Sequence, residues 1–370
     1  PAADHERGGR GRHGGRVKGR PEGGEEMLEL KGLDLPETEA WGEMQGLPPY
    51  RGRQIRQWLF KKLAGSFEEM TDLPAALRHD LGSKALVDRL ELEEARTSSD
   101  GTEKYLFRLH DGPLIESVLI PERDHWTLCI SSQAGCAMGC RFCVTGTMGL
   151  KRNLTAAEII DQVVQVRRRM EEPERLTNIV FMGMGEPLAN YPEALRACHN
   201  LTAEDGFNFS HRRVTLSTCG LAPMIRRLGR ETRVNLAVSL NAADDETRSR
   251  LMPVNKTYPL SELLAACREF PLPNRRMITF EYILISGVND GPGQARSLAG
   301  LLRGIRAKIN LIPLNPHHAL DLAPSPPESI QEFQEILAAH HYTAIVRKSK
   351  GQDISAACGQ LGGGGGGAKG

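Results

Sequence analysis

The 370-residue sequence contains no apolar run close to the roughly 20 residues that a membrane-spanning helix requires. Its first residues are charged and rich in glycine, whereas a secretory signal needs an apolar segment. We therefore expect a cytoplasmic protein with no membrane partner. The sequence also lacks an excess of either charge, since 47 basic residues stand against 46 acidic ones. This balance neither indicates nor excludes a nucleic-acid partner, because a basic face can be offset by an acidic one.

Cysteine is scarce as well, because eight residues in the whole sequence are too few for a disulfide-stapled scaffold. Cys136, Cys140 and Cys143 nevertheless fall together in the stretch "GCAMGCRFC". No fourth cysteine lies beside them, and the nearest histidine, His125, lies on the far side of the preceding predicted strand. Zinc sites usually take their ligands in CxxC pairs. The CxxxCxxC spacing favours a [4Fe-4S] cluster held at three corners, with one iron open to an outside ligand. Zinc and buried structural thiols are the alternatives.

Both ends of the chain have too few apolar residues to form a core. Residues 1–27 carry arginines and lysines among glycines, and we expect a disordered basic tail. This tail is either an RNA-binding arm, or a solvated segment, or upstream sequence before a start at Met27. Residues 362–370 begin with six consecutive glycines and are predicted to be a flexible tail.

Residues 28–96 are predicted to form a small helical domain. In "YRGRQIRQWLFKKL", apolar residues recur at helical spacing, at Ile55, Trp58, Leu59 and Leu63. The basic residues of this segment are Arg51, Arg53, Arg56, Lys61 and Lys62. They suit an RNA-binding face or an ordinary solvated surface equally well. The polar stretch "TSSDGTEK", residues 97–104, is the predicted boundary with the next domain.

Residues 97–361 are predicted to form an α/β core. Residues 104–109 and 115–120 form a predicted hairpin, and after it the pattern strand, loop, amphipathic helix repeats. The six strand candidates lie at residues 125–131, 178–183, 212–218, 234–241, 277–285 and 308–315. The helix after the first strand begins with a capping box of Thr155 and Glu158. This alternation predicts a parallel sheet closed into a barrel or an open barrel, with its chemistry on the loops after the strands.

The three-cysteine motif, with Phe142 directly before the last cysteine, resembles the signature of radical S-adenosylmethionine (SAM) enzymes. More narrowly, residues 28 to 361 resemble the RlmN family of RNA adenine-C2 methyltransferases. The motifs are "IESVLIPE", "TLCISSQAGCAMGCRFCVTG", "RNLTAAEI", "FMGMGEPLAN", "VTLSTCG", "AVSLNA", "GVND", "NLIPLNP" and "GQDISAACGQL". The resemblance implies a partial (β/α)6 radical SAM barrel and a small N-terminal helical accessory domain that binds RNA. Residues 346–361 would be its cysteine-bearing C-terminal segment.

The resemblance also implies the cofactors. A [4Fe-4S] cluster would be held by Cys136, Cys140 and Cys143, and two molecules of SAM would be used per turnover. The implied SAM pocket consists of Gly185, Glu186, Ser217, Ser239, Leu240, Asn241 and Asn315. In "GMGEP" the glycines allow close backbone approach and the carboxylate of Glu186 suits an ammonium group, although a tight turn explains the same residues.

Carbon 2 of adenine is electron-poor, so it does not attack a sulfonium methyl group and needs a radical route. The resemblance implies that Cys358 is first methylated on sulfur, and that a radical from a second SAM then removes hydrogen from this methyl group. The new carbon radical adds to C2. Glu116 matches the proton acceptor, and Cys129 matches the resolving thiol that forms a transient disulfide with Cys358. Without the resemblance, Glu116 would be interpreted as an ordinary strand glutamate, Cys129 as a core thiol and Cys358 as a thiol on a terminal loop.

The implied partners are 23S rRNA, tRNA modified at the adenosine 3′ of the anticodon, and an external flavodoxin-like electron donor, with the enzyme as a monomer. Arg152 and residues 346–351, "VRKSKG", are candidate phosphate contacts. A C8-specific 23S rRNA adenine methyltransferase has the same catalytic residues and is one alternative. A non-catalytic RNA-binding protein that holds zinc on its three clustered cysteines is the other.

Overall fold

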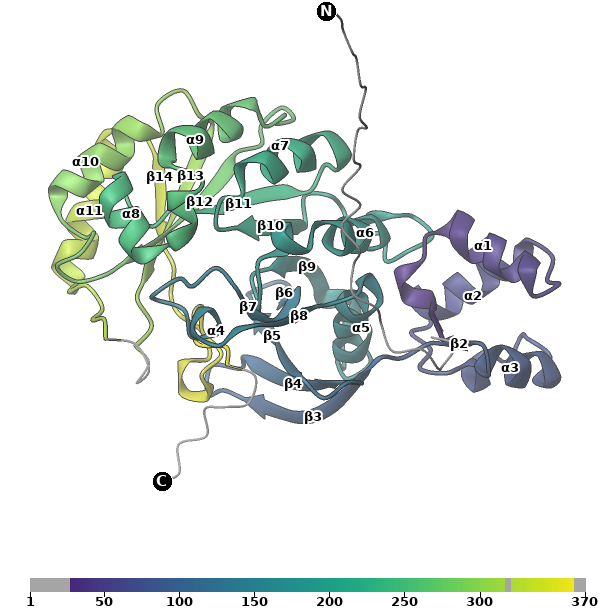
Figure 1. Cartoon of the computed structure of the whole chain (residues 1–370). Helices are drawn as coiled ribbons and strands as arrows, with labels where there is room; N and C mark the ends of the chain where they lie inside the picture. Colours follow the sequence, from purple (N-terminus) through teal and green to yellow (C-terminus); the bar gives the residue numbers. More distant parts are fainter. Residues whose placement is uncertain (1–26, 317–320, 363–370) are drawn as a thin grey trace, which may run out of the picture.

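The computed structural model of the chain describes residues 27–316 and 321–362. The two predicted tails, residues 1–27 and 362–370, lie outside the described residues except for Met27 and Gly362. The fold is built on a ten-stranded sheet with the strand order β14-β13-β12-β11-β10-β9-β6-β5-β4-β3 (Figure 1). A separate small sheet pairs β7 (Gln133–Cys136) with β8 (Gly149–Asn153), and α4 (Val144–Thr147) lies between these two strands.

Strands β6 and β9 to β14 form the parallel part of the sheet. Their bounds are β6 (Trp126–Cys129), β9 (Leu176–Phe181), β10 (Val214–Thr218), β11 (Asn235–Ser239), β12 (Ile278–Leu284), β13 (Ala307–Pro313) and β14 (Thr343–Val346). Neighbouring strands pair in parallel throughout. The first six are the six predicted strands, so the predicted α/β core is confirmed. β14 is an additional parallel strand beside β13 that was not predicted from the sequence.

Helices connect the parallel strands and cover the outer face of the sheet (Figure 1). They are α5 (Ala156–Arg167), α6 (Tyr191–Thr202), α7 (Ala222–Glu231), α8 (Asp245–Leu251), α9 (Leu260–Glu269), α10 (Pro292–Leu301) and α11 (Pro327–Ala339). The predicted capping box is present at the start of α5, where the Thr155 hydroxyl accepts from the Glu158 N–H and the Glu158 carboxylate accepts from the Thr155 N–H. The structure therefore confirms the predicted start of this helix.

Three antiparallel strands extend the sheet beyond β6. They are β3 (Leu90–Thr97), β4 (Glu103–Leu109) and β5 (Leu114–Pro121), and the hairpin of β4 and β5 was predicted. β3 was not predicted, and it pairs with β4 through a tight connection. The stretch at 97–104, predicted as a domain boundary, therefore forms the turn of this hairpin. The strand β3 belongs to the sheet and not to the helical segment before it.

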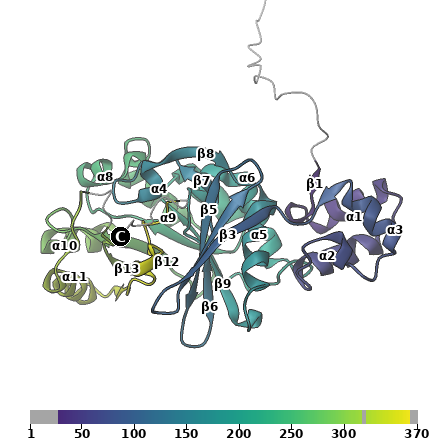
Figure 2. The same ribbon diagram turned by 90° about the horizontal axis from the view of Figure 1, so that it is seen from below.

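The segment before β3 forms a helical unit at one end of the molecule, beyond α5 (Figures 1 and 2). It contains α1 (Leu35–Met44), α2 (Tyr50–Phe60) and α3 (Ala75–Gly82), and the short strands β1 (Leu28–Glu29) and β2 (Ala85–Leu86) pair beside them. Ile55 and Leu59 of α2 are buried, as their helical spacing predicts. Ion pairs with buried cations join this unit to the core. Lys31 bonds Asp161 of α5, and Arg56 bonds Asp205.

The position of Arg56 differs from the prediction, which placed it on the basic surface of the helical domain. Its side chain is 1% exposed and lies in the junction with the core. The guanidinium donates to the backbone oxygen of Leu33 at 2.6 Å and to the side chain of Asn200 at 3.0 Å. Arg56 is therefore a structural residue that RNA cannot reach. No helix in residues 27–316 and 321–362 is both long enough and apolar enough to cross a membrane.

Candidate active site

Four of the residues predicted for catalysis or SAM binding share one face of the sheet. Paired residues of neighbouring strands point to the same side, and so do residues two apart along one strand. The strand register therefore places on one face Glu116 of β5, Cys129 of β6, Ser217 of β10, Ser239 of β11 and Glu281 of β12. The opposite face carries the apolar side chains that pack under the helices. Residues that are more than 160 positions apart in sequence thus face one interior space.

The three motif cysteines lie in the small hairpin of β7 and β8. Cys136 ends β7, and Cys143 directly precedes α4. A Cβ atom on Gly146 would come within 3.0 Å of the backbone N and O of Cys140, so only glycine lets the loop close this tightly. Phe142, the aromatic residue before the last cysteine, is buried in an apolar cluster against which Cys140 and Cys143 pack. The loop presents its thiols in dry surroundings.

This donor set fits an iron-sulfur cluster better than a single ion. Tetrahedral zinc needs its thiolate sulfurs about 4 Å apart. Within the described residues, no three His, Cys, Asp or Glu side chains converge in the way that one ion requires. A cubane cluster spreads three ligands over three separate irons and accepts wider spacing. Burial raises the pKa of Cys140, and the negative charges of Cys143 and Cys136 add to this shift. The three thiols are therefore close enough to influence one another.

The motif thiols are protonated at neutral pH when no metal is bound. Burial raises the pKa of Cys136 to about 11, and it also raises the pKa of Cys140 and of Cys143. Metal ligation requires thiolates, so binding the cluster must release protons.

Glu186 lies buried beside the cysteine loop. One of its carboxylate oxygens accepts from the backbone N–H of Leu188 at 3.0 Å, and the other accepts from that of Cys219 at 2.7 Å. Burial raises the pKa of Glu186, and these backbone donors act against that shift. Its negative charge in turn contributes to the raised pKa of Cys136 and Cys140. The carboxylate is thus fixed near the thiols, where an ammonium group would find an acceptor.

Gly185 precedes this carboxylate in a conformation that favours glycine. Its φ is +97°, and a Cβ atom there would lie 2.5 Å from the Cβ of Gln133. The side-chain oxygen of Gln133 accepts from the backbone N–H of Glu186 at 2.8 Å. Gly185 therefore lets the loop after β9 pack directly on β7, the strand that ends in the first motif cysteine.

The other predicted SAM-binding residues lie at the carboxyl ends of β10 and β11. Ser217 and Ser239 are half-buried on the shared face, and Leu240 is buried. Asn241 has a positive φ of 58°, and its side-chain oxygen accepts from the backbone N–H of Ile283 at 2.8 Å. Its amide side chain therefore joins β11 to β12, so any contact with a ligand falls mainly to its backbone.

Arg248 of α8 is a site residue that sequence reasoning missed. Its side chain is completely buried, and its guanidinium donates to the backbone oxygens of Leu240, Cys219 and Ser239 at 3.0, 2.7 and 3.2 Å. It also donates to the side chain of Asn255 at 2.9 Å. Burial lowers the pKa of Arg248. One cation thus ties the ends of β10 and β11 together beside the cysteine loop, and nothing in its local sequence indicates this role.

The C-terminal segment folds back against the cysteine loop (Figure 1). Asn315, after β13, donates to the backbone oxygen of Cys358 at 3.0 Å and accepts from the side chain of Gln352 at 2.8 Å. The backbone N–H of Val144, directly after the last motif cysteine, donates to the oxygen of Gly359 at 2.7 Å. Asn315 was predicted to bind SAM, and in this structure its amide holds the Cys358 segment.

Cys358 and Cys129 are both free thiols. Cys358 is exposed, but the protein packed around it raises the pKa of its thiol to about 11, with the negative charge of Glu281 as the second cause. Burial also raises the pKa of Cys129, and the charge of Cys358 adds to that shift. The predicted transient disulfide is not formed in this structure, and the pairing of these two cysteines stays a prediction.

Glu116 is buried, and partners bind both of its carboxylate oxygens. One oxygen lies 3.2 Å from Nζ of Lys104, and the other accepts from the backbone N–H of Gly362 at 2.9 Å. The predicted proton acceptor therefore contacts the same segment that carries Cys358. Sequence reasoning missed Lys104, because its place beside Glu116 depends on the pairing of β4 with β5.

Two family models match the chain. One describes the radical SAM superfamily and covers residues 130–296, and the other describes the ribosomal RNA large subunit methyltransferase N-terminal domain and covers residues 28–87. A dual-specificity RNA methyltransferase RlmN from Anaeromyxobacter sp. is 54% identical over 339 residues, which cover 90% of each chain. The chain belongs to the RlmN family.

Further comparisons agree with this membership. An RlmN from Syntrophobacter fumaroxidans is 52% identical over 336 residues, which cover 91% of this chain and 98% of that protein. A crystal structure of a radical SAM methyltransferase from Sphaerobacter thermophilus is 49% identical with a TM-score of 0.88, and the match covers 91% of this chain and 99% of that one. The predicted family and the predicted radical SAM fold are confirmed.

Arg152 does not have the role predicted for it in this RlmN-family chain. Its guanidinium pairs with both oxygens of Asp111 and with both oxygens of Glu158, each at 2.7 Å. These carboxylates raise the pKa of Arg152 against the effect of burial. Because its donors are occupied within the protein, Arg152 fastens β8 to α5 and is not available for a phosphate.

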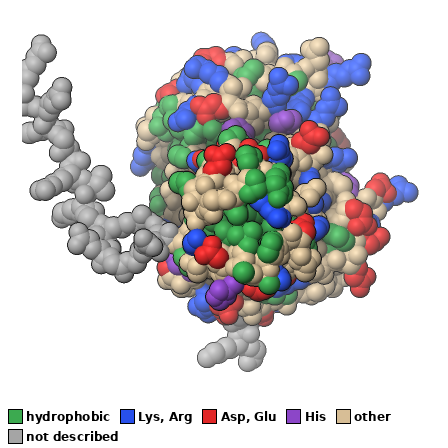
Figure 3. All heavy atoms as spheres, turned by 90° about the vertical axis from the view of Figure 1, so that its right-hand side faces the viewer, with side chains coloured by type: hydrophobic (Ala, Val, Ile, Leu, Met, Phe, Trp, Pro, Cys, Tyr) green, Lys and Arg blue, Asp and Glu red, His purple; other side chains and the backbone are tan. Residues whose placement is uncertain are grey.

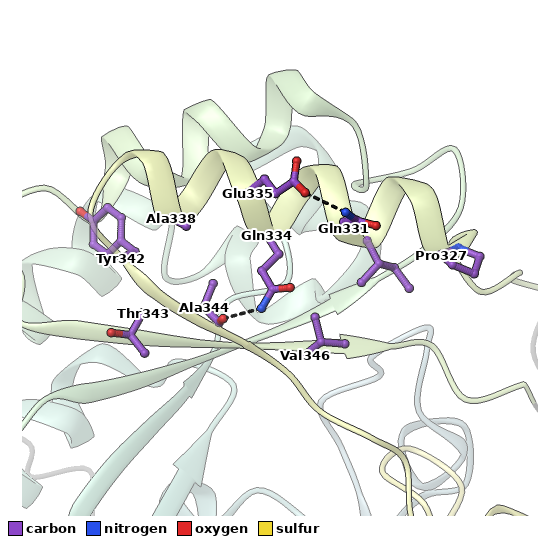
Figure 4. Close-up of a pocket in the computed structure, with 10 residues that line it drawn as sticks. Pro327, Gln331, Gln334, Glu335, Ala338, Tyr342, Thr343, Ala344 and Val346 are labelled. Carbon is purple, nitrogen blue, oxygen red and sulfur yellow. Dashed lines mark hydrogen bonds between the residues drawn. The ribbon is translucent and has the colours of Figure 1, made fainter.

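A groove away from the RlmN motifs lies between α11 and β14 (Figure 4). Its volume is about 750 Å³, and its lining includes Ile330, Ala338 and Val346. Gln334 donates to the backbone oxygen of Ala344 at 2.8 Å across the groove. None of the predicted site residues lines it, so the groove is separate from the candidate active site.

Proposed function

We propose that this protein methylates C2 of adenosine in 23S rRNA and in tRNA through an S-methylcysteine intermediate. The observation that carries the proposal is that, in an RlmN-family chain, the segment of Cys358 contacts both the Glu116 carboxylate and the three-cysteine loop, while Cys129 lies on the same face of the sheet as Glu116. Two thiols and one carboxylate are the groups that such a reaction needs in addition to its cofactors.

Cys136, Cys140 and Cys143 would hold a [4Fe-4S] cluster, and Glu186 with the ends of β10 and β11 would hold SAM. When bound, the cluster and SAM supply one-electron chemistry and the methyl group. The protein keeps this space dry with the apolar cluster around Phe142. It also fixes the Glu186 carboxylate with two backbone donors, which selects for a cationic group at that position.

Cys358 carries the carbon to the RNA in this proposal. Its raised pKa makes the free thiol a poor nucleophile, so methylation requires removal of the thiol proton at the site. Asn315 donates to the backbone oxygen of Cys358 and Val144 donates to that of Gly359, so the backbone directly after the Cys358 side chain is held in place. The Thr145 hydroxyl also donates to the backbone oxygen of Leu361, and the Gln360 side chain donates to that of Pro316, so Cys358 is presented from a docked segment.

Glu116 and Cys129 complete the reaction. After the adduct radical has given up one electron to a one-electron acceptor such as an iron-sulfur cluster, its C2 proton passes to the Glu116 carboxylate. The Cys129 thiolate then attacks the sulfur of Cys358, the bond from that sulfur to the methylene carbon breaks, and the carbon takes a proton to become the methyl group of the released RNA. The disulfide between the two cysteines then needs two electrons from outside before the next cycle. We include a flavodoxin-like reductant, a monomeric enzyme and a cytoplasmic location in the same proposal.

The helical unit offers a surface for the RNA. Figure 3 faces this unit and shows hydrophobic side chains exposed among lysines and arginines. Met44 is 75% exposed and Tyr50 is 49% exposed, and the guanidinium of Arg51 lies 5.0 Å from the ring of Tyr50. Exposed aromatic rings beside cations stack on unpaired bases and bind phosphates. We therefore assign this face to RNA binding.

Nucleoside mass spectrometry tests the proposed function. Ribosomal RNA and tRNA from cells with and without this protein are digested and compared. We expect 2-methyladenosine in both pools only when the protein is present. If 8-methyladenosine appears without the 2-methyl isomer, the C8 alternative is correct. If neither appears, and the purified protein binds zinc and no iron, the protein is not this enzyme.

A further inference from the structure

Lys104 of β4 connects the predicted proton acceptor with the segment that carries Cys358. Its Nζ lies 3.2 Å from a carboxylate oxygen of Glu116 and also donates to the backbone oxygen of Ser355 at 3.2 Å. Lys104 pairs with Val118, which lies two residues from Glu116 on β5, so all three point to the same face. None of the RlmN motifs in the sequence contains Lys104.

The ion pair between Lys104 and Glu116 is largely shielded from water. The side chains of Lys104 and Glu116 are 11% and 3% exposed. Opposite charges in such surroundings attract strongly, and removal of one partner leaves the other buried without compensation. The second oxygen of Glu116 accepts from the N–H of Gly362, which belongs to the C-terminal segment and not to the sheet. Lys104 is thus the partner on the fixed scaffold of the sheet.

We propose that Lys104 is a positioning residue that keeps the Glu116 carboxylate directed at adenine C2. This inference rests on the proposed function. Before the step concerned, the adduct radical gives up one electron to a one-electron acceptor such as an iron-sulfur cluster. The C2–H bond then breaks, its electron pair stays with the ring and restores aromaticity, and the proton passes to Glu116. Lys104 exchanges no proton in this step. Without Lys104, the buried carboxylate would turn toward other donors, and removal of the C2 proton would slow.

Contacts other than those of Lys104 hold the Cys358 segment in place. Asp100 accepts from the N–H of Gly351 at 3.0 Å, and Asp353 accepts from that of Ser99 at 3.0 Å. Together with the bond between Val144 and Gly359, these contacts dock the segment independently of Lys104. Loss of Lys104 is therefore expected to spare methylation of Cys358 and to impair only the later proton transfer.

The test compares Lys104→Met, Lys104→Gln and Lys104→Arg with the wild-type holoenzyme. Arg227→Met, which removes an exposed cation 2.8 Å from Glu231, is the matched control. Intact-protein mass measures the methyl group on Cys358, and gel electrophoresis measures the RNA–protein adduct. An RNA substrate deuterated at adenine C2 measures whether proton removal limits the rate. Lys104→Gln is included because it keeps a hydrogen-bond donor and disturbs packing least.

We expect Lys104→Met and Lys104→Gln to methylate Cys358 like the wild type, but to accumulate adduct. Formation of 2-methyladenosine should fall on the order of 100-fold, with a deuterium effect that the wild type lacks, and Lys104→Arg should restore most of the rate. Wild-type rates in both neutral variants, or loss of Cys358 methylation together with loss of folding in both, would overturn the inference. If the wild-type enzyme itself forms no 2-methyladenosine, the proposed function fails instead.

Discussion

At the scale of single residues, burial sets the protonation states in the active site. Glu281 is the clearest case, because it is 7% exposed on the shared face and its pKa is raised to about 7. Burial is the main cause, while a hydrogen bond from Asn310 and the charges of Arg347 and Lys308 act in the opposite direction. The site thus contains a carboxylate that changes charge near neutral pH, close to the thiol of Cys358.

Glu281 makes the stability of the fold depend on pH. Its folded-state pKa of about 7 lies above the ordinary value of 4.5, so between these values the folded protein binds more protons than the unfolded chain. Stability should therefore fall as the pH rises through this window, by about 3 kcal/mol in total. The free energy of unfolding, measured with urea, should decrease less between pH 5 and pH 8 for Glu281→Gln than for the wild type. Equal decreases in both proteins would contradict this assignment.

The sequence predicts the chemistry of some residues and not of others. Cys136, Cys140 and Cys143 are local in sequence, so their spacing alone indicates a shared ligand. Arg248 and Lys104 act on residues that only the folded sheet brings near them, and no spacing reveals this. Arg152 was predicted as a candidate phosphate contact and Arg56 as part of an RNA-binding or solvated surface, but the fold places carboxylates beside them and uses both arginines internally.

At the scale of elements, the loop after β9 depends on glycine at one position. Gly185 has φ +97° and meets Gln133, whereas Gly304 has φ +80° and no atom within 4 Å of a Cβ placed there. Gly185→Ala and Gly304→Ala both incur the left-handed backbone cost of about 1–2 kcal/mol. Only Gly185→Ala adds a steric overlap next to the cysteine loop.

We therefore expect Gly185→Ala to lower the free energy of unfolding more than Gly304→Ala does, and to weaken SAM binding as well. Chemical denaturation and equilibrium dialysis with SAM measure the two effects. A Gly185→Ala protein that matches Gly304→Ala in both measurements would show that the close approach to Gln133 has no consequence.

The strands that sequence reasoning missed share a physical cause. The segment "LELEEART" of β3 is rich in glutamate and lies at one edge of the sheet, where most of its side chains are exposed. The segment "TAIV" of β14 is short and lies at the other edge. Edge strands carry a weak apolar pattern, whereas the central strands β9 to β13 are covered on both faces and were all predicted from sequence.

At the scale of the whole molecule, buried charges hold the helical unit against the core. Lys31 is completely buried and pairs with both Asp88 and Asp161, and Asp161 also accepts from the backbone N–H groups of Arg89 and Leu90. One lysine thus fixes the segment that leads from the helical unit into the sheet. The RNA-binding face proposed on this unit can then hold a constant distance from the active site.

Lys31→Met should leave Asp161 buried without its cation and lower the free energy of unfolding by about 3–5 kcal/mol. Lys84→Met removes an exposed partner of Asp80 in the same unit and should change it by less than about 1 kcal/mol. Urea denaturation measures both variants. Similar small decreases in the free energy of unfolding of the two variants would mean that the junction does not depend on the ion pair between Lys31 and Asp161.

The central claim is that Cys358 carries the methyl carbon to RNA, and methyl transfer by a Cys358→Ala enzyme tests it most directly. The variant is reconstituted anaerobically with iron and sulfide, and is then supplied with reductant, labelled SAM and ribosomal RNA or tRNA. Cys198→Ala, which removes a buried thiol on α6 outside the site, is the control. We expect Cys358→Ala to take up iron normally and to transfer no label to protein or RNA, while the control transfers label to both. Label reaching adenosine at the wild-type rate in Cys358→Ala would contradict the account.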